Sequence, residues 1–153
     1  MTGTSFEMPL GPFMAAMTKA TTMVADTQHL AEQIGAALVS GTQDRFDAGK
    51  APDGSDWAPT KRGGQILVDT GALKDSVGYE ASPGLVVVGT ADVRAGTHQF
   101  GAKKGAYGST GKGHPIPWGD IPARRFLGIG PDDEEESLQT ASQTLQRVLA
   151  GRG

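Results

Sequence analysis

Glycine is the feature of this sequence that most limits its fold. The chain has 23 glycines among 153 residues, and they cluster in residues 41–130 without a repeating period. This is about twice the usual share of ~7%. Glycine permits the backbone angles that tight turns require. The sequence therefore predicts a central region of short elements joined by many turns, and it excludes collagen-like and solenoid repeats.

Two amphipathic segments flank this region. Before it, apolar residues recur three or four positions apart, which is typical of a helix with one buried face. They are Phe13, Met17, Ala20, Val24, Ala31, Ile34 and Leu38. Asp26 and Thr27 are suited to cap a second helix within this stretch, and Gly49 and Pro52 limit how far it extends.

The second amphipathic segment follows the glycine-rich region, in "PDDEEESLQTASQTLQRVLAG". Its apolar residues repeat with helical spacing and are Leu138, Ala141, Leu145 and Val148. Five consecutive acids, residues 132–136, stand in its first turns, where carboxylates favour the positive end of a helix. A C-terminal helix is therefore expected.

Strand signals lie between these helices. "SVGYEA" and "LVVVGTA" are β-type runs joined by "SPG" at 82–84, which predicts a hairpin. We also expect a strand to end in "THQFG" at 97–101, with Phe100 as an apolar anchor and Gly101 as the exit turn. "PARRFLGIG" at 122–130 is interpreted as a last strand.

This order of elements predicts an α+β fold. The expected architecture is a small antiparallel sheet packed against an N-terminal and a C-terminal helix, with long extended loops. Strand–helix–strand alternation is missing, which argues against a parallel sheet. Residues 1–12 are expected to be a flexible lead-in because they are short and polar and contain two prolines. Residues 13–150 are expected to form one domain with an inserted basic loop, 101–120.

Reactive groups are scarce in the sequence. The chain has no cysteine, which excludes disulfides, zinc–thiolate sites and thiol catalysis. His98 and His114 are sixteen positions apart on a loop and do not match a metal-binding pattern. "AYGSTGKGH" lacks the first glycine and the final Ser or Thr of a phosphate loop. No enzyme activity and no cofactor are therefore expected.

The bulk properties indicate a soluble intracellular product. No window approaches the ~18 apolar residues of a membrane helix, so we expect no membrane partner. The formal net charge is −3, yet residues 94–125 hold six basic residues and one acid, a local charge of +5. Such a loop can meet phosphates, which leaves a nucleic-acid-binding module as an alternative. It can equally meet the acidic residues of a neighbouring copy, or remain a solvated loop.

Four motifs together resemble those of a known family. They are "RFDAGKAPDGSDWAPTK" at 45–61, "ILVDTGALKDSV" at 66–77, "VVVGTADVRAGTHQFG" at 86–101 and "IPARRFLGIG" at 121–130. In this order they are similar to the phage virion morphogenesis family, the tail completion proteins of Mu-like and other tailed phages. Many relatives have a Tyr-Ala pair before His-Gln-Phe-Gly, whereas this sequence has Arg94-Ala95-Gly96 in "VRAGTHQFG". Arg125 stands where a proline often follows the first arginine.

The resemblance implies a structural protein of the virion neck. Such a protein completes the tail and joins it to the head, as a tail terminator or head–tail joining protein, in a ring that is often hexameric. The implied partners are other copies and the connector, tail tube or sheath proteins. Contact with DNA in the channel, where it occurs, would be non-specific. The implied location is the head–tail junction of the virion, and the host cytoplasm during assembly.

Residue roles follow from these patterns. Trp57 is expected to fold back as a lid on the core, and Phe126 and Leu127 to be buried. Arg124 and Arg125 are expected on opposite faces of a strand, so one faces the body and the other a partner carboxylate. The expected contact residues are Arg94, Lys103, Lys104, Lys112, Trp118, Arg124, Arg125, Asp132, Asp133 and Glu134. The expected structural residues are Phe46, Trp57, Thr70, Gly71, His98, Gln99, Phe100, Gly101 and Phe126.

Overall fold

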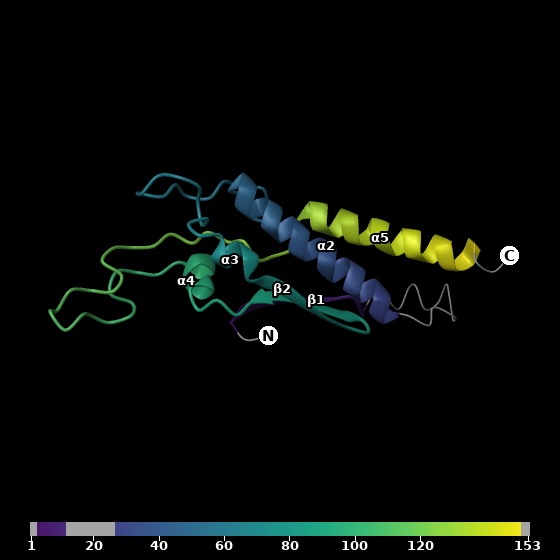
Figure 1. The fold of residues 1–153 in the computed structure, drawn as a ribbon, viewed down its shortest axis with the longest axis horizontal. Helices are drawn as coiled ribbons and strands as arrows, with labels where there is room; N and C mark the ends of the chain where they lie inside the picture. Colours follow the sequence, from purple (N-terminus) through teal and green to yellow (C-terminus); the bar gives the residue numbers. More distant parts are fainter. Residues whose placement is uncertain (1–2, 12–26, 151–153) are drawn as a thin grey trace.

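The computed structural model describes residues 3–11 and 27–150 (Figure 1). Its elements, in chain order, are β1 (Thr4–Pro9), α2 (Thr27–Ala48), α3 (Ala72–Asp75), β2 (Val77–Ser82), β3 (Leu85–Thr90), α4 (Ala95–Phe100) and α5 (Pro131–Ala150). A three-stranded antiparallel sheet and two long helices make an α+β fold, as the sequence predicts.

The sheet has β3 at its centre, in the order β1-β3-β2. β2 and β3 form the predicted hairpin, with Ser82 opposite Leu85 and Val77 opposite Thr90. β3 is the most apolar strand, and its alternate residues Val86 and Val88 are fully buried. These side chains share one face because strand side chains alternate, and α2 packs on β2 and β3.

β1 corrects the expectation of a flexible lead-in for residues 4–9 of the predicted stretch 1–12. Thr4–Pro9 pairs with β3 along its whole length, from Thr4 opposite Thr90 to Pro9 opposite Leu85. Pro9 is tolerated because it ends an edge strand, where an amide donor is dispensable. The alternation of Phe6 and Met8 with polar residues signals this strand, and both side chains pack against the core.

α2 is described from Thr27 and ends at Ala48 before Gly49, which has a positive φ. Its buried face includes Leu30, Ile34 and Leu38, as the periodicity indicates. A methyl group at Gly35 would overlap the ring of Tyr79, so a glycine lets the helix approach β2 closely. The earlier part of the predicted period, at Phe13, Met17, Ala20 and Val24, lies outside the described residues.

α5 lies beside α2 and runs antiparallel to it (Figure 1). Thr144 late in α5 contacts Gln33 early in α2, whereas the start of α5 meets the end of α2. Ala141 is buried and Leu145 partly buried, as predicted. Leu138 differs from its prediction: it is 54% exposed. The side chain of Val148 lies outside the part of the chain that the structure describes.

Two predicted strands are wrong. "THQFG" belongs to the short helix α4, Ala95–Phe100, and not to a strand. Residues 122–130 are extended but pair with no strand of the described chain. Their backbone is instead held by side chains from other segments. Local composition does not predict this arrangement, because the bonding partners are distant in sequence.

Candidate functional site

The extended segment 122–128 is the meeting point of three of the sequence motifs. We call this region the junction, and it comprises Arg45 and Phe46 of α2, Trp57–Pro59, His98 and Gln99 of α4, and residues 122–128. Phe46 and Phe126 are fully buried, with ring centroids 5.2 Å apart. Trp57 meets Phe46 edge-on at 5.5 Å. These buried positions confirm that Trp57 and Phe126 belong to the core.

Gln99 binds the backbone of this segment in place of a neighbouring strand. Its amide nitrogen donates to the carbonyl of Leu127 at 2.8 Å. Its amide oxygen accepts from the N–H groups of Phe126 and Leu127, both at 3.1 Å. Because Gln99 is buried, these three bonds satisfy backbone groups that water cannot reach.

We expect Gln99→Leu to destabilise the protein by about 2–4 kcal/mol, because it leaves three buried backbone groups without partners. Urea unfolding followed by circular dichroism would measure the change. Gln43→Leu is the control: it is an amide on α2 outside the junction and should change the free energy of unfolding by less than about 0.5 kcal/mol. Equal effects of the two substitutions would contradict the role assigned to Gln99.

Arg124 and Trp57 fix the same segment against the loop after α2. The guanidinium of Arg124 donates to the carbonyls of Ala58 and Pro59 at 2.7 and 2.9 Å. The indole N–H of Trp57 donates to the carbonyl of Arg125 at 2.7 Å. Arg124 is buried, whereas the side chain of Arg125 is 65% exposed. The two arginines therefore face opposite ways, as predicted, although the segment is not a strand.

The position of Asp133 differs from the expectation that this residue contacts a partner. It is 5% exposed and forms an ion pair with Arg45. Its carboxylate also accepts from the N–H of Gly130 at 2.7 Å and so caps α5. Arg45 further donates to the carbonyl of Gly128 at 3.2 Å. This acid therefore ties α5 to α2 and to the junction.

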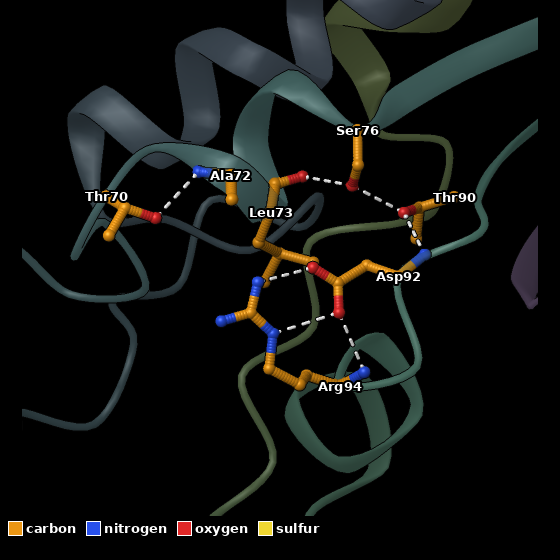
Figure 2. A network of polar contacts seen from close by, with 7 residues as sticks. All are labelled: Thr70, Ala72, Leu73, Ser76, Thr90, Asp92 and Arg94. Carbon is orange, nitrogen blue, oxygen red and sulfur yellow. Dashed lines mark hydrogen bonds and ion pairs between the residues drawn. The ribbon is translucent and has the colours of Figure 1, made fainter.

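A polar network links α3, β3 and the turn before α4 (Figure 2). Ser76 donates to the carbonyl of Leu73 and shares a 2.5 Å hydrogen bond with Thr90. The hydroxyl of Thr90 accepts from the N–H of Asp92 at 3.0 Å. The guanidinium of Arg94 in turn donates from Nε and Nη2 to the carboxylate of Asp92, at 3.0 and 2.6 Å. These bonds from Arg94 lower the pKa of Asp92 to about 2.

The predicted structural residues Thr70 and Gly71 lie at the edge of this network. The hydroxyl of Thr70 accepts from the N–H of Ala72 at 3.3 Å. Gly71 has a φ of 82°, which favours glycine. They shape the turn into α3. Arg94 is paired with Asp92 but keeps a side chain that is 57% exposed, so its contact role stays a prediction.

The basic loop forms an ordered projection, which we call the arm (residues 102–121). Ala102 and Ile121 exchange backbone hydrogen bonds of 2.9 and 2.7 Å at its base. Further along, the backbone N–H of Tyr107 donates to the carbonyl of Ile116 at 2.8 Å. The backbone N–H of Thr110 donates to the carbonyl of His114, also at 2.8 Å. Figure 1 shows the arm, in green, extending away from the helices and the sheet.

Gly101 sets the direction of the arm at its base. Its φ is 74°, and an added Cβ would lie 2.7 Å from the carbonyl oxygen of Ile121 and 2.9 Å from the nitrogen of Ala123. The predicted exit turn is therefore confirmed, and a side chain here would separate the two sides of the arm.

Large apolar side chains are exposed on and beside the arm. Trp118 is 75% exposed, and Phe100, at the end of α4, is 74% exposed. Phe100 is therefore not the buried anchor that the sequence predicts. Tyr107 is also exposed and shares a 2.5 Å hydrogen bond with Thr97 of α4. Exposed aromatic side chains are enriched at protein–protein contact surfaces.

One carboxylate of the arm, Asp120, engages two of its lysines. Lys103 pairs with Asp120 at 3.3 Å, and the N–H of Lys104 binds the same carboxylate. Lys112, near the tip, has no carboxylate partner among the described residues. Of the acidic residues expected to contact partners, Asp132 and Glu134 are exposed at the start of α5.

Two further classes of site are not seen in the described part of the chain. Within residues 3–11 and 27–150, no three His, Asp or Glu side chains gather where they could hold a metal ion. None of the described helices has both the length and the apolarity to cross a membrane. The arrangement is therefore best described as a packed junction that supports an exposed arm.

The comparisons with known proteins give the family of this chain. The phage virion morphogenesis family matches residues 10–146. The chain is 30% identical over 136 residues to "Mu-like prophage FluMu G protein 2" of Haemophilus influenzae, covering 88% of this chain and 90% of that protein. No solved structure matches this chain. The chain belongs to the phage virion morphogenesis family and has a structural role in virion assembly.

Proposed function

We propose that the protein is a subunit of a hexameric ring in the phage neck, where it completes the tail and joins it to the head around the DNA channel. In this role it is a structural protein and not an enzyme. The observation that carries the proposal is the arm, which is ordered by its own hydrogen bonds and exposes Trp118 beyond the body.

The arm suits a contact between successive subunits. It leaves the body at one end of the molecule, while α5 runs toward the other end (Figure 1). A projection that docks on a different surface of the next copy makes a head-to-tail contact, and such contacts form a ring when the rotation between successive copies closes. The junction holds the base of the arm rigid, so less conformational entropy is lost on docking.

The same reasoning names the partners. Neighbouring copies occupy the ring, and connector, tail tube or sheath proteins meet its two faces. The protein acts where the head of the virion meets the tail, after assembly in the host cytoplasm. The alternative is a nucleic-acid-binding module that uses residues 94–125. It is less favoured because Arg94 and Lys103 are paired with carboxylates.

We expect Trp118→Ser to reduce infectious particles by about 100-fold in a complementation assay, because a central aromatic contact contributes roughly 2–4 kcal/mol to association. The control is Val93→Ser. Val93 is 93% exposed but lies before α4, outside the arm. Both variants should unfold at the wild-type denaturant concentration. A Trp118→Ser titre equal to that of Val93→Ser would contradict the arm's role in assembly.

A further inference from the structure

A pocket of about 280 Å³ lies between the turn into α3, the helix α4 and the junction. Its lining includes Arg62, Asp69, Leu73, Arg94, His98 and Arg124. Figure 2 labels three of the residues that line it, Thr70, Leu73 and Arg94. Three arginines and a histidine around one pocket make it a candidate for an anion.

Arg124 is the buried cation of this pocket. Two of its nitrogens, Nε and Nη2, donate to the carbonyls of Ala58 and Pro59. No carboxylate of the described residues lies within ion-pair distance of it, and no described residue accepts a hydrogen bond from Nη1. A buried charge is costly unless it is paired. Arg45, the other largely buried arginine, has Asp133 as its partner.

His98 is the second group without a partner. Its Nδ1 is buried and makes no hydrogen bond. Burial, together with the charges of Arg124 and Arg94, lowers the pKa of His98, so the ring is neutral at pH 7; Asp92 acts weakly in the opposite direction. A neutral ring can carry its proton on Nδ1 and donate it.

The other charged groups of the pocket are already engaged. Arg94 binds Asp92, and Arg62 binds Asp69 at 3.1 Å. Each of these pairs is close to neutral. The unmatched positive charge is therefore that of Arg124, and one negative charge would balance it.

We propose that this pocket binds the carboxylate of an acidic side chain from the start of α5 in a second copy of the chain. The carboxylate would accept hydrogen bonds from Arg124 and His98, and the apolar wall at Leu73 would contact its methylene stem. This inference rests on the proposed ring, because the ring brings the second copy into contact.

Charge complementarity favours that occupant. Asp132, Glu134, Glu135 and Glu136 are exposed, and none of them is paired with a basic residue among the described parts of the chain. They form the densest acidic stretch of the sequence. A carboxylate on a flexible stem enters a pocket of this size more readily than a phosphate fixed in a duplex backbone.

The test is an NMR titration of His98 in the full chain with a peptide of sequence GPDDEEES, which is residues 130–137. A bound carboxylate favours the protonated ring, so the pKa of His98 should rise and binding should tighten as the pH falls. The control peptide GPNNQQQS should leave the His98 signal unchanged. Arg124→Lys should weaken binding of the acidic peptide by about tenfold.

The outcomes separate this inference from the ring. A His98 signal that responds to neither the acidic peptide nor acetate would overturn the pocket, even if the protein forms a neck ring. A response to inorganic phosphate alone would overturn the carboxylate assignment and point to nucleic-acid backbone. Peptide binding by a protein that is missing from the neck would support the pocket and contradict the proposed function.

Discussion

Asp133→Ala should lower the free energy of unfolding by about 3–5 kcal/mol, because it leaves the guanidinium of Arg45 buried without its counter-charge. The same substitution removes the acceptor for the N–H of Gly130 and so uncaps α5. Chemical denaturation followed by circular dichroism measures the loss. Asp132→Ala is the matched control, since Asp132 is an exposed acid in the same turn and should contribute less than about 0.5 kcal/mol.

The pair can also be tested by replacement with apolar residues. Exchanging a buried ion pair for side chains of similar volume is often neutral, so Arg45→Met combined with Asp133→Leu should recover part of the stability lost in Asp133→Ala. If Asp133→Ala and Asp132→Ala had the same small effect, the ion pair would not be the link between α2, α5 and the junction.

Phe46→Ala is expected to have a comparable effect, about 3–5 kcal/mol, because it leaves a cavity where Trp57 and Phe126 meet. The junction should loosen, and with it the base of the arm. Thermal unfolding measures the stability, and the fluorescence of Trp57 should shift toward that of an exposed indole. Because Trp118 also emits, the measurement belongs in a Trp118→Phe background.

Phe100→Ala is the matched control for Phe46→Ala. The two residues have the same side chain, but Phe100 is 74% exposed and should change the stability by less than about 0.5 kcal/mol. If Phe100→Ala destabilised the protein as much as Phe46→Ala, Phe100 would be a core residue and the exposed face at the base of the arm would be misassigned.

The elements that the sequence predicts well are those with strong local signals. The hairpin around Pro83-Gly84 follows from turn chemistry in a few adjacent residues. The burial of Trp57 and Phe126 was also predictable, since large aromatics in a small core rarely remain outside it.

The errors share a physical cause. The segment around Phe126 is apolar and extended like a strand, yet the amide of Gln99 takes the place of a neighbouring strand. The exposure of Phe100 depends on the helical turn of α4, which places Gln99 inside and Phe100 outside. Asp133 appears in sequence as one acid of five, and only the distant Arg45 distinguishes it from its neighbours. Side-chain bonds across 27 to 88 residues carry no local signature.

The most direct test of the neck assignment is cryo-electron microscopy of purified virions. The account predicts density for a ring of this chain between the head connector and the tail tube, with the arm of each copy on the next. Mature particles whose neck contains no density for this chain would contradict it.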